Sequence, residues 1–496
     1  MISNYRALLA LLAPETILVV TALLVLVADL GLLRGRDPRR RATVAAMLGG
    51  LGCFLAMAFL LQPPEPRNLL DGMLVVNPLT QLVKQYLLFI TFGTLILAVE
   101  SRCTCHVGEY FALLILATVG FMFMVSSENL LMIFVSLELA SLSLYILTAF
   151  ARQTLASAEA ALKYYLFGGL SAAFMLFGMS LLYGLTGEIH LADIADHTRS
   201  LGLDPLLILA MAMIVVGLGF KIAAVPFQLW APDVYQGAPV PSAALIASGS
   251  KVASFFLLAK VAMVGFSGLE GSGGWGQFQA GWVPLLAVLA AFSIILGNLA
   301  ALAQQSLKRL LAYSAIAHAG YMLTGVVAGG ESGLVSLLYY VLTYALTAVG
   351  AFGVVAVVEA QAGDDRLSSF AGLSRRAPLM SFCLLVFLLS LAGIPPLAGF
   401  FGKFYMFSAA AGAGQHQLGM LWLVILAIAM SAVSLYYYLQ VLKQVYVSAP
   451  APAAGRLVIP LPVQVVIACL ALSVIILGCF PNLLAGKLLL AFHGGH

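Results

Sequence analysis

The stretch Leu130-Leu-Met-Ile-Phe-Val-Ser-Leu-Glu138-Leu-Ala-Ser-Leu-Ser-Leu-Tyr-Ile-Leu-Thr-Ala-Phe150 decides the fold class of this 496-residue chain. It matches the roughly 20 apolar residues that a helix needs to cross a lipid bilayer. Its one charged residue, Glu138, lies in the middle, where a charge costs about 2.5–3.5 kcal/mol on insertion scales. The stretch therefore predicts a membrane-spanning helix and marks Glu138 as a candidate functional residue.

The composition of the whole chain extends this prediction. Hydrophobic residues make up 62% of it and charged residues only 9%, whereas a soluble protein spends about a quarter of its residues on charge. Such a chain cannot cover itself with a water-facing surface, so lipid must be its main solvent. Because the apolar segments follow one another with short loops, we predict one transmembrane domain over residues 1–496.

Windows of similar length and composition predict about fourteen transmembrane helices in an all-α integral membrane protein. They lie near 8–33, 42–61, 79–99, 110–126, 130–150, 160–184, 206–230, 240–264, 283–303, 309–329, 333–359, 378–408, 419–445 and 462–485. The opening segment lacks a small-residue cleavage pattern and is longer than the apolar region of a signal peptide, so we expect it to be retained.

Lysine and arginine in the loops predict the orientation, because cytoplasmic loops carry an excess of both. Fourteen follow odd-numbered helices: Arg34, Arg36, Arg39, Arg40, Arg41, Arg102, Arg152, Lys308, Arg309, Arg366, Arg375, Arg376, Lys443 and Arg456. Four lie on the other side: Arg6, Arg67, Arg199 and Lys487. We therefore predict a multi-pass protein of the bacterial inner membrane with both termini on the periplasmic side.

The cysteines do not predict a metal or redox centre. Cys103, Cys105 and His106 form the one short cluster of candidate ligands, and no second cluster accompanies it. The other cysteines considered lie in apolar segments: Cys53, Cys383, Cys469 and Cys479. The chain has no Walker loop, haem attachment motif or iron–sulfur spacing. We expect no cofactor in this chain, and lipid, water and protons rather than nucleic acid as its surroundings.

Five charged residues lie inside predicted helices and form the candidate site: Glu138, Lys163, Lys221, Lys251 and Lys403. Several buried charges are an expense that packing alone does not explain, so they predict a path for protons. The alternative is a set of inert ion pairs that only hold helices together.

Four other charges received different interpretations. Lys84 and Lys260 lie towards the outer ends of their helices, and we expect their ammonium groups to extend to the membrane interface. Glu15 and Asp29 lie near helix ends and were assigned no role.

Two of the lysines accompany interrupted helices. Pro226 follows Lys221 by five residues, and Pro395 and Pro396 precede Lys403. Proline removes a backbone donor and clashes with the preceding turn of a helix. Carbonyl groups freed at membrane depth require contact with protein or water. We therefore expect water near both lysines, as proton transfer requires.

Polar residues also recur on one face of three intact helices, where they favour either interhelical hydrogen bonds or a hydrated path. His318 is the titratable member besides Glu138. The three sets are Glu138, Ser141 and Tyr145; Ser314, His318 and Tyr321; and Tyr340, Thr343, Tyr344 and Thr347.

The spacing of these features suggests an internal duplication. Lys221 and Lys403 are 182 residues apart, and Glu138 and His318 are 180 apart. Paired interrupted helices indicate repeated transporter halves. We predict N-terminal helices 1–3 (1–105), a first repeat of helices 4–8 (106–265), a second of helices 9–13 (280–446) and a final helix (447–496). An odd number of helices per repeat makes the second copy inverted.

Long motifs within these segments resemble those of the antiporter-like membrane subunits of respiratory complex I. They are Lys221-Ile-Ala-Ala-Val-Pro-Phe-Gln-Leu-Trp-Ala-Pro-Asp-Val-Tyr-Gln-Gly-Ala-Pro-Val-Pro-Ser up to Lys251, the block 304–320 and the block 391–406. The piece 232–239, Pro-Asp-Val-Tyr-Gln-Gly-Ala-Pro, resembles the N-type members in particular.

The resemblance implies a proton-translocating subunit of an NADH:quinone oxidoreductase, driven by redox chemistry in other subunits. NADH, FMN, iron–sulfur clusters and quinone would then bind in those partners, and neighbouring membrane subunits would contact this chain. It further implies that Glu138 and Lys221 act as a pair, Lys251 as the central lysine, Lys403 as the exit lysine and Lys163 as the sixth-helix lysine.

One position departs from the family pattern, because Gln228 replaces the usual histidine. Glutamine bonds water but does not titrate, so proton storage at this position is in doubt.

The predicted mechanism is a switch in charge. Burial favours the neutral form of a lysine, and a nearby carboxylate favours the charged form. Movement of Glu138 relative to Lys221 would release a proton towards Lys251 and then Lys403. A cation/proton antiporter of the Mrp type without a redox partner, and a purely structural membrane subunit, are the alternatives.

Overall fold

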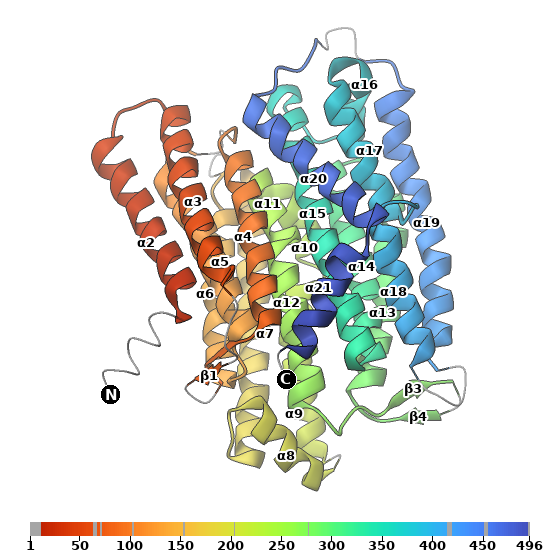
Figure 1. Ribbon diagram of the computed structural model, residues 1–496. Coiled ribbons are helices and arrows are strands. Elements are labelled where there is room, and N and C mark those ends of the chain that lie inside the picture. The colour runs from red at the N-terminus through yellow and green to blue at the C-terminus, as the bar shows by residue number, and fades with distance from the viewer. Residues whose placement is uncertain are drawn as a thin grey trace.

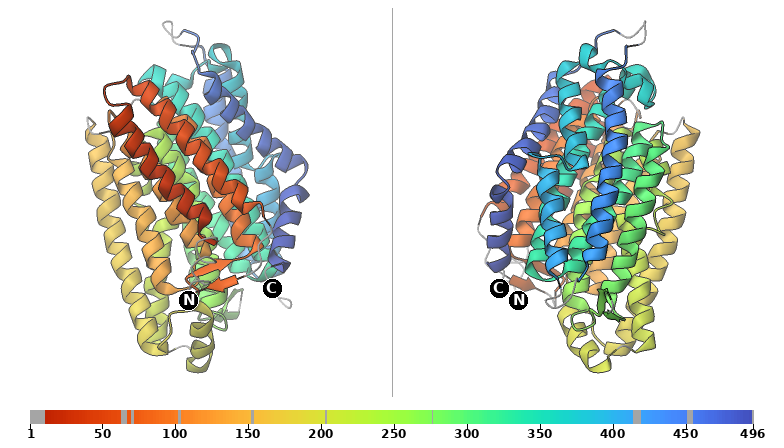
Figure 2. Two further views of the ribbon diagram at one scale, coloured as in Figure 1. Left: turned by 60° about the vertical axis from the view of Figure 1, so that its left-hand side comes forward. Right: turned by 90° about the vertical axis from the view of Figure 1, so that its right-hand side faces the viewer.

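The structure is a computed structural model that describes residues 11–62, 67–69, 72–101, 104–151, 154–202, 204–275, 277–413, 419–450 and 455–494. Its long helices run along one common direction and form a bundle (Figures 1 and 2). Within the described residues, thirteen helical segments are long and apolar enough to cross a membrane.

These segments are α2 (Ala13–Val27) with the π-turn η1 (Ala28–Leu32), α3 (Pro38–Leu60), α4 (Pro78–Ala98), α5 (Val107–Ser126), α6 (Leu130–Thr148), α7 (Leu155–Thr186), α9 (Pro205–Ile222), the run α11 (Val240–Ala247), α12 (Gly249–Lys260) and η2 (Val261–Gly265), then α13 (Trp282–Leu302), α14 (Leu307–Ala328), α15 (Gly330–Ala362), α19 (Leu421–Tyr446) and α20 (Leu461–Cys479). Thirteen of the fourteen predicted windows coincide with one of these described segments. The predicted all-α membrane fold is confirmed.

The twelfth window is divided between two shorter helices, α17 (Pro378–Ala392) and α18 (Ala398–Gly412). The seventh is divided in the same manner, because α10 (Ala231–Gly237) follows α9 after a gap. Each first half ends at a residue in the left-handed region, Ala223 with φ 57° and Gly393 with φ 87°. Both predicted interruptions are therefore present, each shortly before a proline.

The two lysines occupy different sides of these breaks. Lys221 lies in the last turn of α9, before its break, whereas Lys403 lies in α18, after its break. The 182-residue spacing therefore does not place them at equivalent positions relative to the interruption, because the chain enters the second half-helix before it reaches Lys403.

A backbone hydrogen-bonding unit recurs in the two halves. Leu130 N–H donates to Ile189 and Leu191 N–H to Glu128, and the same exchange joins Leu307 with Asp365 and Leu367 with Gln305. The first unit precedes α8 (Leu191–Leu201), and the second precedes η3 (Leu367–Phe370) and α16 (Leu373–Arg376).

Helices α8 and α16 lie at opposite ends of the bundle (Figure 1). The inverted sense of the repeats stays a proposal, which this recurrence supports. The starts of α6 and α14, at Leu130 and Leu307, are 177 residues apart. That register aligns His318 with Ser141 rather than with Glu138, which a spacing of 180 had suggested.

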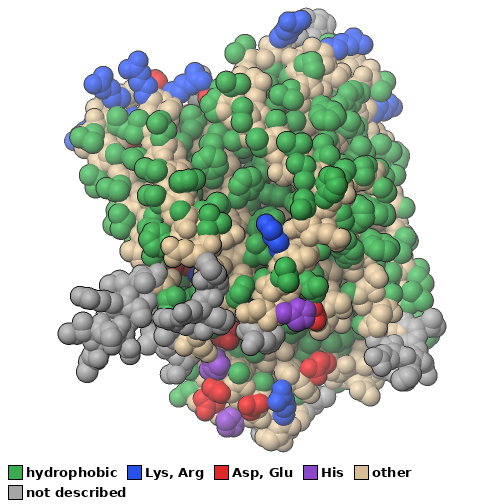
Figure 3. All heavy atoms as spheres, viewed as in Figure 1, with side chains coloured by type: hydrophobic (Ala, Val, Ile, Leu, Met, Phe, Trp, Pro, Cys, Tyr) green, Lys and Arg blue, Asp and Glu red, His purple; other side chains and the backbone are tan. Residues whose placement is uncertain are grey.

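Charge separates the two ends of the bundle. In the view of Figure 3, lysine and arginine side chains gather at the upper end, whereas aspartate, glutamate and histidine predominate at the lower end. Hydrophobic side chains cover the band between. The distribution is that of a membrane protein whose basic end faces the cytoplasm. Arg6, Arg102 and Arg152 from the predicted charge count lie outside the described residues.

Several short elements were not expected from the sequence. At the lower end lie α8, and two hairpins that pair β1 (Arg67–Leu69) with β2 (Leu74–Val76) and β3 (Ser272–Gly274) with β4 (Gln277–Gln279). The short helix α21 (Asn482–His493) follows α20. These elements are too short to register as apolar windows.

Three segments form the centre of the bundle. The window of Val240–Gly265 is 100% buried, and those of Leu307–Ala328 and Gly330–Ala362 are each 94% buried. Helices α12, α14 and α15 therefore place their polar side chains away from lipid, where a candidate site must be sought.

Candidate functional site

Glu138 and Lys221 approach each other between α6 and α9. Lys221 is 6% exposed, and its Nζ donates to Ser141 Oγ, one turn beyond Glu138. The carboxylate and the ammonium interact electrostatically. No ion pair of 4.0 Å or less joins them in the described chain, and Glu138 Oε1 is buried without a hydrogen-bond partner there. The serine hydroxyl, not the carboxylate, therefore holds the lysine in this conformation.

Aromatic rings surround the same ammonium group. Lys221 Nζ lies 5.3 Å from the ring centre of Tyr145, 5.5 Å from that of Phe220 and 5.9 Å from that of Tyr164. Tyr164 stacks on Trp230 with centroids 4.4 Å apart. Ring faces attract a cation, so this cage offers partial compensation for a buried charge that Glu138 does not contact directly.

Lys251 lies beside the end of the first half-helix. It is 1% exposed, and its Nζ donates to Ile222 O at 3.3 Å and to Ala315 O. Ile222 is the last residue of α9 and follows Lys221 directly. An ammonium group at a helix C-terminus is favoured by the unpaired carbonyls and the helix dipole. The break thus places the second lysine next to the first.

His318 lies at the centre of α14 and is fully buried. Its Nδ1 shares a hydrogen bond with Tyr340 Oη at 2.6 Å, and its Nε2 shares one with Tyr438 Oη at 3.1 Å. It interacts electrostatically with both Lys251 and Lys403. The imidazole and its two tyrosines therefore form a hydrogen-bonded group between the two lysines.

Lys403 caps the other half-helix. Its Nζ donates to Leu391 O at 3.0 Å, Ala392 O at 3.1 Å and Ser431 Oγ at 2.8 Å, and it lies 4.9 Å from the ring centre of Tyr321. Ala392 is the last residue of α17. Lys251 and Lys403 therefore share one environment, a buried ammonium on the freed carbonyls of an interrupted helix.

Lys163 does not join this buried group. Its side chain is 37% exposed and forms ion pairs with Glu159 at 2.7 Å and with Asp233 at 2.6 Å. Asp233 also pairs with Arg309 at 2.7 Å. The lysine thus belongs to a charge network at the margin of α7 and α10, which position along the sixth helix alone did not reveal.

Gln228 lies in the break between α9 and α10 and is 7% exposed. Its Oε1 is buried and has no hydrogen-bond partner among the described residues. A buried amide oxygen is normally bonded to protein or to water. The position can therefore hold a water molecule, although it cannot store a proton.

The predicted polar stripes divide into two kinds. Ser314 Oγ shares a hydrogen bond with Tyr438, and Tyr321 Oη accepts one from Asn298 Nδ2 at 3.0 Å, so these residues connect helices. Thr343 and Thr347 donate to carbonyls of their own helix at 2.9 and 2.8 Å. The two threonines therefore add no link between the lysines.

Two lysines that we expected at the interface are buried instead, so that prediction is wrong. Lys84 pairs with Glu15 at 2.6 Å, and the two side chains are 3% and 2% exposed. Lys260 donates to Val125 O at 2.9 Å and pairs with Glu128 at 3.4 Å. Their partners lie on other helices, so distance from the helix end could not reveal them.

Asp29 was assigned no role, and it is 1% exposed. Both its carboxylate oxygens accept from Arg41, at 2.7 and 2.6 Å, and Gly108 N–H also donates to it at 2.8 Å. The bidentate pair holds η1 against α3 and α5, so a structural function accounts for it.

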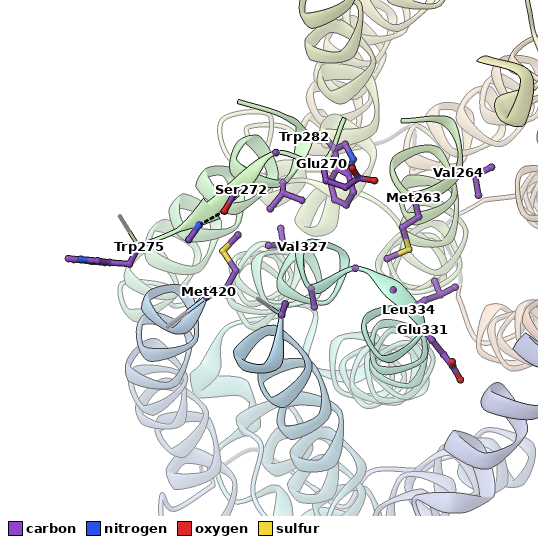
Figure 4. A pocket seen from close by; sticks show the side chains of 18 of the residues that line it. Met263, Val264, Glu270, Ser272, Trp275, Trp282, Val327, Glu331, Leu334 and Met420 are labelled. Carbon is purple, nitrogen blue, oxygen red and sulfur yellow. Dashed lines mark hydrogen bonds between the residues drawn. The ribbon is translucent and has the colours of Figure 1, made fainter. Parts of the chain in front are cut away.

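An open cleft of about 710 Å³ lies apart from these lysines, at the end of the bundle that carries β3 and β4 (Figure 4). Glu270 and Glu331 are the acidic residues of its lining, which is otherwise mostly apolar. Within the described residues, no group of three or more His, Cys, Asp or Glu side chains is arranged to hold a metal ion. Cys103 of the proposed metal fragment lies outside those residues, and Cys105 is exposed.

Comparison with known proteins identifies similar chains. Residues 127–431 match the family model described as "NADH:quinone oxidoreductase/Mrp antiporter, TM". NADH-quinone oxidoreductase subunit N 2 of Acidobacterium capsulatum is 52% identical over 490 residues, which cover 97% of this chain and 98% of that protein. A chain of respiratory complex I from Thermus thermophilus with bound aureothin superposes with a TM-score of 0.79 at 35% identity, covering 96% and 99% of the two chains.

A chain of the Mrp complex from Dietzia sp. superposes with a TM-score of 0.82 at 20% identity, covering 97% of each chain. At this identity the likeness shows a shared fold alone.

Proposed function

The chain belongs to the NADH:quinone oxidoreductase/Mrp antiporter family of membrane proteins, and from this membership we propose that it is a proton-translocating, antiporter-like subunit of a bacterial NADH:quinone oxidoreductase. The relatives named subunit N and the complex I chain support the redox-driven form of this function. The complex is the enzyme, whereas this chain supplies a proton path without a redox centre of its own.

The partners follow from the same proposal. NADH, FMN, iron–sulfur clusters and quinone would bind to other subunits, and neighbouring membrane subunits would surround this chain in the bilayer. The basic end of the bundle would face the cytoplasm, which places both termini on the periplasmic side. The two repeats, 106–265 and 280–446, would each contribute one interrupted helix to the path.

The observation that carries the proposal is the series of lysines at the two helix breaks. Lys251 contacts the carbonyl of Ile222, next to Lys221, and Lys403 contacts the carbonyl of Ala392 at the other break. His318 lies between Lys251 and Lys403 in electrostatic contact with both. Freed carbonyls, serine hydroxyls and tyrosine hydroxyls provide each ammonium group with polar partners in the absence of a bound carboxylate.

The transfer begins at the loosely coupled acid and lysine. Approach of Glu138 to Lys221 stabilises the charged lysine, and its withdrawal favours release. A proton released from Lys221 would pass to Lys251 beyond the end of α9, and then through the His318 group to Lys403. Water at Gln228 would hydrate the first break. Lys163, half-exposed and already paired, would support the path from its margin.

The test is the substitution of Lys221 by Ala and by Arg in the assembled oxidoreductase. Both variants are expected to lose proton pumping, Ala because it cannot carry a proton and Arg because it does not release one at working pH. Pumping is measured by a pH-sensitive dye in inverted membrane vesicles and normalised to assembled complex, with the exposed Lys443→Ala as the control. Full pumping by both Lys221 variants would exclude Lys221 as the carrier.

A cation/proton antiporter of the Mrp type is the second candidate, because the fold is shared with a chain of an Mrp complex. It predicts cation-dependent proton flux when the chain is reconstituted without dehydrogenase subunits. Absence of that flux, together with NADH-driven pumping in the assembled complex, would favour the oxidoreductase. A structural subunit with inert ion pairs would instead tolerate every charge-conserving substitution.

A further inference from the structure

Lys260 shares the environment of the two proposed carriers but has no part in the path described above. Its Nζ donates to Val125 O at 2.9 Å and Ser127 O at 3.3 Å, where α5 ends at Ser126. Like Lys251 and Lys403, it is thus an ammonium group on the terminal carbonyls of a helix. Unlike them it also has an acid beside it, Glu128 at 3.4 Å.

From Glu128 a short series of titratable groups continues to the surface. His190 Nε2 lies 3.9 Å from Glu128 Oε2, and His190 Nδ1 lies 3.3 Å from Asp193 Oδ2. The exposed fraction of the side chains rises along the series, from 9% for Lys260 to 20% for Glu128 and 55% for Asp193. The groups therefore lead from the interior to the end of the bundle where α8 lies (Figure 1).

The backbone holds this series in place from three segments. Glu128 N–H donates to Gly72 O at 2.8 Å, and Leu191 N–H donates to Glu128 O at 2.9 Å. Gly72, with φ 76°, approaches His190 so closely that a Cβ there would lie 2.3 Å from the imidazole Cδ2. The loop before α4 thus covers the imidazole, and His190 Nε2 is buried without a hydrogen-bond partner in the described chain.

The same lysine lies on the helix that carries Lys251. Nine residues separate Lys251 from Lys260 on α12, a rise of about 13.5 Å. Between them Ser254 Oγ is buried without a hydrogen-bond partner among the described residues, as is Ser126 Oγ at the end of the neighbouring α5. Buried hydroxyls of this kind are normally bonded to protein or water, so both are positions for a bridging water.

Directly after Lys260 the helix continues as the π-turn η2. Such turns are frequent at functional sites.

We propose that Lys260, Glu128, His190 and Asp193 form a proton-release branch that leads from Lys251 to the periplasmic end of the first half. The branch rests on the proposed function and its orientation. It lets the first half release a proton without passage through the His318 group and Lys403.

Each step transfers one proton between nitrogen and oxygen atoms. Lys260 gives a proton to the Glu128 carboxylate and becomes a neutral amine. The Glu128 acid crosses the 3.9 Å gap by a small rotation or through water and protonates His190 Nε2. Asp193 takes the Nδ1 proton and releases it to bulk water. A flip of the ring restores its starting tautomer, and Lys260 takes its next proton from the Lys251 side.

The test uses Lys260→Arg, Glu128→Gln and Asp193→Asn in the assembled oxidoreductase, with Asp196→Asn as the matched control. Asp196 lies on the same helix, α8, and its side chain is 71% exposed in a pair with Arg199. Arginine preserves the charge and the ion pair of Lys260 but holds its proton. If the lysine is only a structural partner, Lys260→Arg keeps full pumping.

The expected result is a loss of protons pumped per NADH in the first two variants. Loss of a positioned proton carrier slows its transfer step by about 100-fold or more. Asp193→Asn is expected to show a smaller loss, because water can reach His190 directly, and Asp196→Asn none. His190→Gly should lose pumping and regain part of it with added imidazole, which restoration of packing alone would not explain.

The outcomes separate this branch from the proposed function. Wild-type pumping in Lys260→Arg and Glu128→Gln, together with loss in Lys221→Arg, overturns the branch and leaves the main path intact. Full pumping in all three overturns both. If Glu128→Gln fails to assemble, Lys260→Arg and the imidazole response of His190→Gly decide the matter.

Discussion

Replacement of Lys403 separates the two functions that its position allows, the capping of α17 and the carriage of a proton. Its ammonium makes three hydrogen bonds, to Leu391 O, Ala392 O and Ser431 Oγ. Hydrogen bonds to a charged group contribute about 1.5–3 kcal/mol each, and a buried acceptor left unpaired costs about 1–3 kcal/mol. Lys403→Met removes these bonds but also removes a buried charge, so we expect a net destabilisation of about 1–3 kcal/mol together with loss of pumping.

Lys403→Arg is the informative variant. Arginine can donate to the same carbonyls, and the added volume beside Gly393 is expected to cost about 1–3 kcal/mol. A Cβ at Gly393 would already lie 3.1 Å from Lys403 Cδ, so the site is closely packed. The reference pKa of arginine exceeds that of lysine by about 2–3, which makes proton release roughly 100- to 1,000-fold less favourable. Capping therefore survives in this variant whereas pumping is lost.

The assay is NADH-driven proton uptake into inverted membrane vesicles, normalised to the amount of assembled complex. Thermal unfolding of the purified complex in mild detergent measures the stability of the same variants. Lys443→Met is the control, because Lys443 is exposed near the end of α19 and lies outside the breaks. Wild-type pumping by Lys403→Arg would refute the assignment of Lys403 as a carrier and leave only its capping function.

Two further predictions test the surroundings of the path. Ser141→Ala removes the hydroxyl that holds Lys221, a charge-assisted bond of about 1.5–3 kcal/mol; pumping should fall but not vanish, since water can replace the hydroxyl, and unchanged kinetics would show that the bond is not used. Glu15→Leu should destabilise the complex by about 3–5 kcal/mol in thermal unfolding, because Lys84 is left buried without its partner. The double variant Glu15→Leu with Lys84→Met should recover most of that loss, and equal stability of the single and double variants would contradict a buried ion pair.

The helix assignment from sequence succeeded where length and composition are sufficient. A window such as 206–230 needs only its apolar residues to predict a span, and Pro226 was enough to predict the interruption. Windows respond to length, however, and α8 is too short for one. The elements that the sequence did not reveal are therefore the short ones at the ends of the bundle.

The charged residues show the limit of an argument from position along one helix. Lys84 and Lys260 lie near helix ends, which predicted contact with the interface, yet each meets an acid on another segment. Lys163 lies within its helix and is nevertheless 37% exposed. Which face of a helix points inward depends on its neighbours, and a single sequence does not contain their arrangement.

The sequence by itself determined the membrane fold, the two interrupted helices and the unusual charges, because each follows from local composition and from the chemistry of proline. Only the tertiary structure decided which groups meet. It placed Lys251 on the carbonyl of Ile222, Lys403 on that of Ala392, and Ser141 rather than Glu138 on Lys221. The physical reason is that a buried ammonium takes the nearest polar atoms in three dimensions, and helices far apart in the chain supply them.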